Sequence, residues 1–539
     1  MLLDLREMDD HAHLESQVCI VGAGAAGISL ARRLASQSVD VLLLESGGAD
    51  HEDAVQDLAK GETQGHDYWE LREARLRFFG GTTAIWGGRC AEFDPNDFDR
   101  RPWLAHSGWP ISKSDLDPFY ADARAAMGLP PRQCADEIWA SLGETPPQFE
   151  PGGLVSDFWQ FTPSSEQFTL RRCGDLVESD KVRILLHATL TSIERSHDGR
   201  SIETIGIGDV SGRRATVSAR HFVLAAGGIE NARLLLACDI GNEHDQAGRY
   251  FMEHPHARGG EIVSGKLWKI LRQFGRHLRD PEGHKHAALI RPSAEMQERE
   301  GILGSAFTLG ACQREQAREI ATMRAYNKMR HDLSPSARNR ALWLTAKKIV
   351  LRGHEVFDPL RSKLLVMSGW SATPVIRAEQ APNPDSRITL GESTDALGMR
   401  EARLDWRFSD IDKRTVRVMM KRFARELERL GIGRFELDPW IERSDEIWHS
   451  DPLVCSHYKG GYHHMGTTRM SASPRDGVVD AECRVHGVEN LHVAGSSLFT
   501  TSGWANPTLG IVALAYRSAD YIAREISRPQ AQARLRKAS

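Results

Sequence analysis

A glycine-rich turn near the N-terminus has the residue types and spacing of a dinucleotide-binding site. The sequence Gly22-Ala-Gly24-Ala-Ala-Gly27 follows the apolar run 17–21 and precedes a helical pattern, and Glu45 lies 23 residues after Gly22. The first glycine permits a tight turn, the second lets a pyrophosphate approach the helix N-terminus, and the third allows close packing. A carboxylate at Glu45 can bind both ribose hydroxyls of an adenosine. The turn alone does not distinguish NAD from FAD.

A second glycine cluster indicates a flavin. Residues 78–88 read Phe-Phe-Gly-Gly-Thr-Thr-Ala-Ile-Trp-Gly-Gly, so two Gly-Gly pairs flank a short segment that ends in Trp86. Backbone of this kind can lie flat against a planar ring, and its amides can bond polar ring atoms. We therefore expect FAD, with contacts from this loop at Gly81, Thr82, Thr83, Trp86, Gly87 and Gly88.

Short apolar runs of strand length must hold these loops in place. They lie at residues 17–21, 39–44, 181–186, 220–225 and 491–495, and an amphipathic helix is expected at 509–526. Strand, turn, helix and strand in succession make the unit of a nucleotide-binding fold. Because such runs recur far apart in the chain, we expect an α/β protein, α+β overall. It should combine a discontinuous Rossmann-like FAD-binding domain with a substrate-binding domain built on an antiparallel sheet plus helices.

The expected domains alternate along the chain. Three parts form the FAD-binding domain, at residues 1–110, 176–258 and 441–539, and the last of these carries the C-terminal histidine motif. Residues 111–175 are expected to be a cap or substrate segment, and residues 259–440 the substrate-binding domain.

A basic stretch interrupts the second domain. Residues 310–363 hold twelve Lys or Arg against five acids, which predicts a basic helical insertion. Such a helix could make a peripheral contact with a membrane surface or an acidic partner. The alternative is a solvated helical face beside a cavity.

Composition excludes several classes of protein. The 539 residues carry 69 Lys+Arg and 73 Asp+Glu, so the basic excess typical of nucleic-acid binding is missing. The eight cysteines are scattered, and no His, Cys and Asp spacing compels a metal site, so we expect reduced thiols and no metal. No apolar run approaches the roughly 18–20 residues that cross a bilayer. The acidic N-terminus is unlike a secretory signal, which favours a cytoplasmic location. A serine hydrolase is not expected, because no Gly-x-Ser-x-Gly elbow follows a strand.

Taken together, the motifs resemble the glucose–methanol–choline (GMC) family of FAD oxidoreductases, in style nearest to its sugar-oxidising branch. The resemblance covers nearly the whole chain and includes the fingerprint ending at Glu45, the loop 78–88, and the segments 225–236 and 248–255. Only residues 260–375 match no family motif. The resemblance implies further FAD contacts at Ala25, Ala26, Ser46, Leu190, Ala226, Gly227, Gly495, Ser496, Asn506, Pro507 and Thr508.

The resemblance also implies the catalytic residues. In the family, a His of the C-terminal motif, paired with a His or Asn some forty residues later, faces flavin N5 and handles the substrate hydroxyl. Here the first matches His463 and the second Asn506, 43 positions later. A neutral imidazole can accept the hydroxyl proton at neutral pH, and the amide can bond the developing alkoxide. His464 is the rival base, and His254 is a weaker candidate for the cavity wall.

Two positions depart from the family. Pyranose oxidases carry a flavin-linked His where this sequence has Ile85, so FAD is expected to be held without a covalent bond. Many members have an Asp where this sequence has Gly495. The expected reaction converts a sugar, glycoside or polyol alcohol to a carbonyl, with electrons passing to a quinone, a redox protein or oxygen, of which oxygen is used poorly. The alternatives are the same chemistry on benzylic alcohols, and a flavoprotein subunit that acts mainly through a redox partner.

Overall fold

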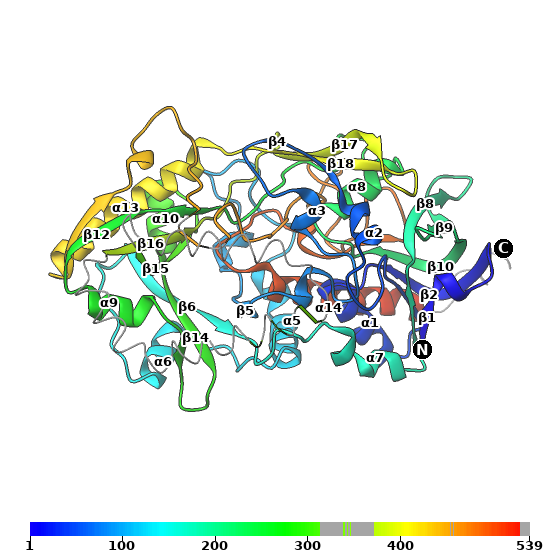
Figure 1. Cartoon of the computed structure of the whole chain (residues 1–539), viewed down its shortest axis with the longest axis horizontal. Helices are drawn as coiled ribbons and strands as arrows, with labels where there is room; N and C mark the ends of the chain where they lie inside the picture. Colours follow the sequence, from blue (N-terminus) through cyan, green and yellow to red (C-terminus); the bar gives the residue numbers. More distant parts are fainter. Residues whose placement is uncertain are drawn as a thin grey trace.

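The framework consists of two large β-sheets and one small one, with helices packed against them (Figure 1). The structure is a computed structural model, and it describes residues 1–312, 371–452, 454–455 and 457–528, with the short pieces 338–339, 342 and 345. The first sheet occupies one end of the long axis and the second sheet the other (Figure 1). Nearly all of the expected basic insertion at 310–363 lies outside the described residues.

The first sheet is mixed, with a parallel centre. Strands β1, β7, β3, β2, β10 and β20 pair in parallel, whereas β9 and β8 are antiparallel. Every residue of β3 is buried, as is typical of a parallel strand covered on both faces. In sheet order the strands are β1 (Leu2–Asp4), β7 (Val182–Leu186), β3 (Val41–Leu44), β2 (Ala12–Val21), β10 (Arg214–Leu224), β9 (Ile202–Gly208) and β8 (Thr189–Arg195), and β20 (Leu491–Val493) pairs with β10.

Helices cover this sheet. Helix α1 (Ala25–Ser36) follows β2 directly and packs against α14 (Pro507–Ser527), which also packs against α5 (Lys113–Ala126). Proline at the first position of α14 suits a helix start, because that position has no intrahelical partner for an N–H. The first residues of α1 and of α14 line the cavity described below, so both helices begin beside it.

Within the described part of the chain, the second sheet has nine strands, and all its pairings are antiparallel. Helix α13 (Asp410–Arg429) packs against its β19 and β6 strands through a buried face that includes Met419 and Phe423. In sheet order the strands are β19 (Gly433–Leu437), β12 (Gly260–Gly265), β16 (Ser371–Arg377), β15 (Ala306–Cys312), β14 (Lys285–Pro292), β6 (Leu154–Phe161) and β5 (Arg89–Cys90). Strand β11 (His256–Arg258) pairs with β16, and β13 (Leu278–Arg279) with β14.

A small third sheet and several short helices complete the described chain. Strand β4 (Gly61–Gly65) pairs in parallel with β18 (Arg400–Trp406), which pairs antiparallel with β17 (Arg387–Thr394). The other helices are α2 (Asp53–Gln56), α3 (Leu71–Ala74), α4 (Pro95–Phe98), α6 (Ala135–Ser141), α7 (Gly174–Glu178), α8 (Glu230–Ala237), α9 (Leu267–Phe274) and α10 (Ala294–Glu300).

The expected fold class is confirmed. The five apolar runs form β2, β3, β7, β10 and β20 of one sheet, and the C-terminal helix is α14. The sequence pattern did not anticipate that the two-residue strand β5, directly after the loop 78–88, joins the second sheet through β6. The domain limits expected from the sequence stay predictions.

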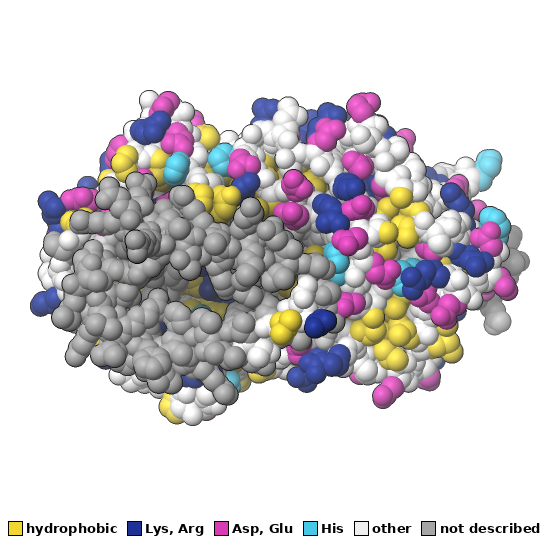
Figure 2. Space-filling model, viewed as in Figure 1, with side chains coloured by type: hydrophobic (Ala, Val, Ile, Leu, Met, Phe, Trp, Pro, Cys, Tyr) yellow, Lys and Arg dark blue, Asp and Glu magenta, His cyan; other side chains and the backbone are white. Residues whose placement is uncertain are grey.

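The described surface carries mixed charge. On the face in Figure 2, basic and acidic side chains alternate over the first-sheet end of the molecule. No helix within the described ranges is long and apolar enough to cross a bilayer. The described cysteines form no disulfide: Cys19, Cys90, Cys173 and Cys483 are buried, Cys238 and Cys455 partly so, and Cys134 is exposed.

Candidate active site

A cavity of about 890 Å³ has walls from both large sheets. Most of the FAD-site residues expected from the sequence line it, and we call their part of the wall the nucleotide end. These residues are Gly22, Gly24, Ala25, Ala26, Glu45, Ser46, Gly81, Thr82, Thr83, Trp86, Gly87, Leu190, Ala226, Gly227, Gly495, Ser496, Asn506, Pro507 and Thr508. His463 and Asn506 line the same cavity, so the candidate base and the nucleotide end share one space.

Gly27 and Gly88 are expected site residues that the described lining does not include. A Cβ on Gly27 would lie 1.9 Å from the carbonyl oxygen of Gly22, so this glycine lets α1 pack against the turn, as its spacing suggested. A Cβ on Gly88 would lie 2.6 Å from the hydroxyl of Thr162. Both glycines therefore permit close packing behind the cavity wall.

The nucleotide end fits a dinucleotide. Among the described residues, a Cβ on Gly24, the N-cap of α1, would meet nothing within 4 Å, and no side chain caps that helix. The first-turn amides of α1 are thus available to a pyrophosphate, which the helix dipole favours. The same open space surrounds Gly227 and Gly495. The site therefore offers backbone donors and room where the sequence predicts them.

Glu45 is held in position by the backbone. Its carboxylate accepts hydrogen bonds from the amides of Ala23 and Gly47, both at 3.0 Å. Burial raises the pKa of Glu45, and these amides counteract the rise. A carboxylate has about four acceptor positions, so two remain for the hydroxyls of a ribose.

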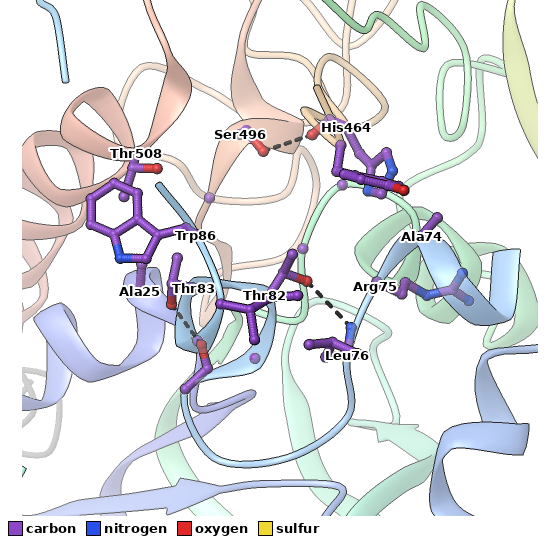
Figure 3. Close-up of a pocket in the computed structure, with 18 of the residues that line it drawn as sticks. Ala25, Ala74, Arg75, Leu76, Thr82, Thr83, Trp86, His464, Ser496 and Thr508 are labelled. Carbon is purple, nitrogen blue, oxygen red and sulfur yellow. Dashed lines mark hydrogen bonds between the residues drawn. The ribbon is translucent and has the colours of Figure 1, made fainter. Parts of the chain in front are cut away.

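The glycine loop is braced by short hydrogen bonds (Figure 3). The hydroxyl of Thr83 donates to the carbonyl of Gly80 at 2.6 Å, and the hydroxyl of Thr82 accepts from the amide of Leu76 at 3.3 Å. The indole of Trp86 donates to the carbonyl of Ser165 at 3.0 Å. These bonds hold the loop in its conformation.

A buried ion network that was not expected from the sequence pattern supports this loop. The carboxylate of Glu230, on α8, lies 3.2 Å from Arg75, 2.6 Å from Arg77 and 2.9 Å from Arg233. Burial by itself raises the pKa of Glu230, but the three guanidinium charges outweigh it and lower the pKa. The signal was present, because Glu230 lies within the segment 225–236 that resembles a family motif.

His463 lies between two hydrogen-bond partners. Its Nδ1 is 2.8 Å from Nδ1 of His254, and its Nε2 is 3.3 Å from Nδ2 of Asn506. The structure thus brings together the two residues expected to be catalytic. It also places His254, the weaker candidate, in direct contact with His463.

The partners of His254 determine which nitrogen of His463 can act as a base. Nε2 of His254 lies 2.9 Å from the carbonyl oxygen of Gly503 and 3.2 Å from that of Ser502. Carbonyl oxygens only accept, so this nitrogen carries the proton, and Nδ1 of a neutral His254 is the acceptor. His463 must then donate from Nδ1, which leaves its Nε2 with a lone pair. The amide nitrogen of Asn506, a donor, faces that lone pair.

His463 is neutral at neutral pH. Burial lowers its pKa well below the ordinary value, and the charge of Arg89 acts in the same direction. The unprotonated form is the one that can accept a proton.

His464 has a different environment. Its Nε2 lies 2.9 Å from the hydroxyl of Tyr68, and the hydroxyl of Ser496 donates to its backbone carbonyl at 2.6 Å (Figure 3). Burial lowers the pKa of His464 to about 3. This side chain is therefore engaged away from Asn506, although it also lines the cavity.

Glu253 holds the segment that carries His463. Its fully buried carboxylate accepts from the backbone amides of Gly461 and His463 and from the hydroxyl of Tyr68, at 3.1, 2.9 and 2.7 Å. Burial raises the pKa of Glu253 to about 7, against the effect of these donors. Glu253, which precedes His254 in the sequence, therefore holds the backbone around Gly461 and His463 in place.

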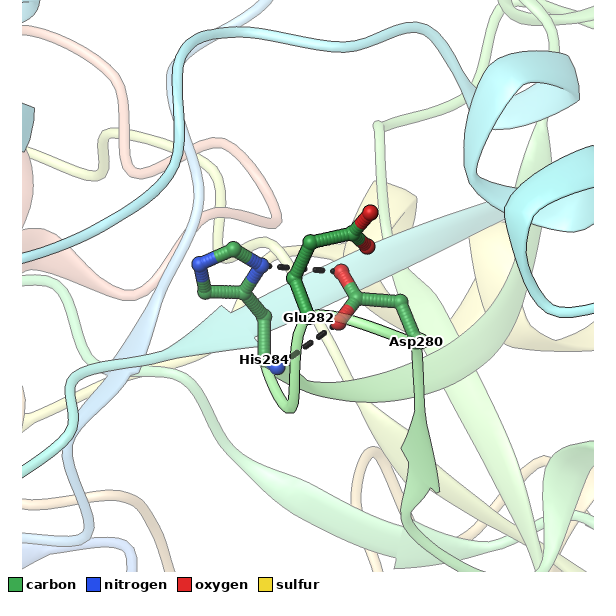
Figure 4. Close-up of side chains that lie close together, drawn as sticks. All are labelled: Asp280, Glu282 and His284. Carbon is green, nitrogen blue, oxygen red and sulfur yellow. Dashed lines mark hydrogen bonds and ion pairs between the residues drawn. The ribbon is translucent and has the colours of Figure 1, made fainter.

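Three potential metal-ligating side chains gather at one hairpin. Asp280, Glu282 and His284 lie between β13 and β14 with their ligand atoms within 4.8 Å of one another (Figure 4). Asp280 accepts from the amide of His284 at 2.7 Å and contacts its Nδ1 at 2.9 Å, which accounts for the shape of the turn. None of the three is among the described residues that line the cavity.

Comparisons with known families agree with this geometry. The family model described as FAD dependent oxidoreductase matches residues 17–305, more than half of the chain, and the model described as GMC oxidoreductase matches residues 382–515. The chain belongs to the FAD-dependent oxidoreductases, and it is an enzyme of the GMC type.

Individual relatives align with most of this chain. The fructose dehydrogenase large subunit of Gluconobacter japonicus is 22% identical over 95% of this chain and 98% of its own. A C-glycoside 3-oxidase of Microbacterium trichothecenolyticum is 25% identical over 83% of this chain and 75% of its own. The solved structure of pyridoxine 4-oxidase from Mesorbium loti is 17% identical, covers 94% of this chain and 99% of that one, and superposes with a TM-score of 0.53. This structural likeness supports the fold.

Proposed function

We propose that the enzyme oxidises the alcohol of a sugar, glycoside or polyol to a carbonyl, with His463 as the base. The observation that carries the proposal is the hydrogen-bond chain from the Gly503 carbonyl through His254 to His463. It leaves Nε2 of His463 as a proton acceptor in the cavity that continues into the nucleotide end. Without this hydrogen-bond chain, either ring nitrogen of His463 could be the one that accepts the proton.

The residues divide the work of the reaction as follows. An alcohol that becomes a carbonyl loses a proton from oxygen and a hydride from carbon. The substrate hydroxyl replaces the Asn506 amide at Nε2 of His463, which takes the proton, and the amide donates instead to the oxygen as negative charge develops on it. FAD, when bound at the nucleotide end, supplies the acceptor for the hydride. After the transfer, the protonated His463 still donates from Nδ1 to His254, so its charge stays hydrogen-bonded.

The substrate class is supported by the relatives. One is named for fructose and another for a C-glycoside, and both align over most of the chain. A sugar or polyol is therefore preferred over a benzylic alcohol.

The acceptor belongs to the same proposal: we expect electrons to pass to an acceptor other than oxygen. A fixed positive charge near the reacting flavin edge assists oxygen reduction, and the partner of His463 is the neutral Asn506. The charge of Arg89, which contributes to the lowered pKa of His463, acts against this expectation, and the reoxidation rates decide between the two. Stopped-flow reoxidation by air-saturated buffer is therefore compared with reoxidation by a quinone, and oxygen reoxidation as fast as flavin reduction would contradict this expectation.

A substrate panel tests the reaction itself. The purified holoenzyme is mixed anaerobically with sugars, polyols and benzylic alcohols, and the loss of oxidised-flavin absorbance is followed. We expect bleaching by sugars or polyols at rates well above those with benzylic alcohols. Faster bleaching by benzylic alcohols would contradict the substrate class. A holoenzyme that no alcohol bleaches would contradict the reaction.

A further inference from the structure

The end of the cavity opposite the nucleotide end is lined by basic side chains of the second sheet. We call it the basic end, and its members are Arg89 on β5, His256 on β11, Lys285 on β14 and Arg377 on β16, with His277 between β13 and α9. The acidic residues of the described lining are Glu45, Asp53, Glu73 and Glu230. All four belong to the segments around the first sheet and α8, where Arg72, Arg75 and Arg77 also line the cavity, so the acids of the described lining come from other segments than the basic end.

Two arginines of the basic end share one aromatic support. The guanidinium of Arg89 lies 4.6 Å from the ring centre of Trp159, and that of Arg377 lies 5.2 Å from it. Arg89 also lies 5.5 Å from the ring of Phe161. Such stacking positions a guanidinium but leaves its N–H edge available for a planar or tetrahedral oxyanion.

These two cations have no acidic partner within the described ranges. Among the described residues, no carboxylate lies within 4.0 Å of either guanidinium, and Nε of Arg89 is buried without a hydrogen bond. The only hydrogen bond from the Arg377 side chain in this set reaches the hydroxyl of Thr308 at 3.1 Å. Burial lowers the pKa of both groups, and the charge of Arg377 lowers that of Arg89 further. Two neighbouring cations that are largely desolvated are unfavourable unless an anion joins them.

The arginines lie close to the candidate base. The charge of Arg89 contributes to the lowered pKa of His463, and that of Arg377 contributes to the lowered pKa values of His254 and His256. An anion held by the two guanidinium groups would therefore lie near His463, within the same cavity.

We propose that the substrate carries an oxyanion, a carboxylate or a phosphate ester, which Arg89 and Arg377 bind while its hydroxyl reaches His463 and Asn506. This inference rests on the proposed alcohol oxidation and narrows its substrate to an acidic sugar or hydroxy acid. Guanidinium groups bind carboxylate and phosphate in a bidentate manner, which would also orient the substrate. A cationic alcohol is excluded by repulsion at the same groups. Bound anion offsets positive charge near His463 and so makes it a stronger base.

Matched substrate pairs test the proposal by turnover. Flavin bleaching by glucuronate is compared with that by glucose, gluconate with glucitol, and glucose 6-phosphate with glucose, all at one ionic strength. We expect kcat/KM for at least one acidic member to exceed that of its neutral partner at least tenfold. A preference for glucuronate or gluconate identifies a carboxylate, and a preference for glucose 6-phosphate identifies a phosphate.

Substitutions locate the preference. R89M and R377M should each lower kcat/KM for the preferred acid at least tenfold, through the loss of one charge-assisted interaction, and should lower that for the neutral partner much less, so that the preference for the acid falls. R434M, which removes an exposed arginine of β19, is the control and should change neither value. FAD content and melting temperature are measured for each variant, and R89K, which keeps the charge but loses the fork, should retain part of the preference.

A binding measurement separates this inference from the proposed function. Cyclohexanecarboxylate and cyclohexylphosphate, which have no hydroxyl to oxidise, are titrated calorimetrically into the holoenzyme, with cyclohexanecarboxamide as the neutral control. Binding of an anion that R89M and R377M weaken at least tenfold supports the inference even if no alcohol is oxidised. Alcohol oxidation with neither acid preference nor arginine-dependent anion binding would overturn the inference and leave the proposed function intact. Absence of both would overturn both.

Discussion

At the nucleotide end the cavity wall is largely backbone, whereas at the basic end it is made of long side chains from separate strands. Gly24, Gly227 and Gly495 present open backbone to the cavity, and they follow or precede strands of a single sheet. Arg89 and Arg377 come from strands almost three hundred residues apart. A backbone wall suits a ligand common to many enzymes, and a wall of side chains suits one that distinguishes this enzyme from others.

The largest effect is expected from closing the nucleotide end. In Gly24→Val, the new side chain occupies space that is open in the protein, so the fold is unaffected while a pyrophosphate is excluded. We expect the affinity for FAD to fall at least tenfold, which is about 1.4 kcal/mol of binding free energy, with the melting temperature of the apoprotein unchanged. FAD is measured by absorbance after reconstitution.

The matched control is Gly174→Val, at the start of α7, where a Cβ also meets nothing within 4 Å. It should keep its FAD.

Acid precipitation of the parent enzyme should release all FAD, because Ile85 stands where a linking His is found in related enzymes. Flavin that remains in the pellet would disprove non-covalent binding.

Among variants that keep their FAD, the largest effect on the rate is expected at the base between the two ends. His463→Ala should slow flavin reduction about a hundredfold or more, the usual scale for a positioned general base. His464→Ala is the matched control, since it removes only a bond to Tyr68, and it should cost far less. The rates come from anaerobic stopped-flow absorbance, and the reverse order of effects would assign the base to His464.

A smaller effect is expected at the residue that orients the base. His254→Phe keeps a ring but removes the acceptor for Nδ1 of His463, so we expect the rate of flavin reduction to fall about tenfold. Loss of that acceptor also destabilises the protonated form, so the acid limb of the pH–rate profile should move to lower pH. An unshifted profile, with FAD content and melting temperature preserved, would show that His254 does not act through His463.

The smallest effect is a change in how stability depends on pH. Burial raises the pKa of Glu253 from 4.5 to about 7, so the folded protein binds this proton more tightly than the unfolded chain does. The resulting stabilisation is complete below pH 4.5 and is lost as the pH rises towards 7. Glu253→Gln should therefore flatten the melting temperature between these values, whereas Glu436→Gln, at an exposed position, should not. Equal slopes in all three proteins would contradict the raised pKa.

The sequence predicted the nucleotide end well because its signals are local. The turn at Gly22, the strand that ends before Glu45 and the helix that begins at Pro507 are each contained in a short stretch of chain. The geometry that follows from such a stretch is nearly independent of the rest of the fold. Gly27 and Gly88 differ only in lying behind the wall.

The basic end was not predicted because no local pattern marks it. Arg89 reads as the residue after a glycine loop, and Arg377 follows directly on the region 260–375, which has no family motif. Arg89 and Arg377 come together through the pairing of β5 with β6 and of β15 with β16. In each pair, the two strands lie far apart in the sequence. The tautomer of His463 was hidden for the same reason, since it depends on carbonyls of Ser502 and Gly503 acting through His254.

Strand β5 has a consequence for how this enzyme could exchange parts with its relatives. Arg89 pairs with Phe161 of the second sheet, and Trp86, three residues earlier, lies in the wall of the nucleotide end. In a chimera that takes its second sheet from a relative but keeps the native loop 78–88, β5 would no longer pair in this register. The loop that lines the nucleotide end would then be displaced. Residues 78–90 and the second sheet should therefore come from the same parent. The crossover point between the two parent sequences should lie before Phe78 rather than after the glycine loop.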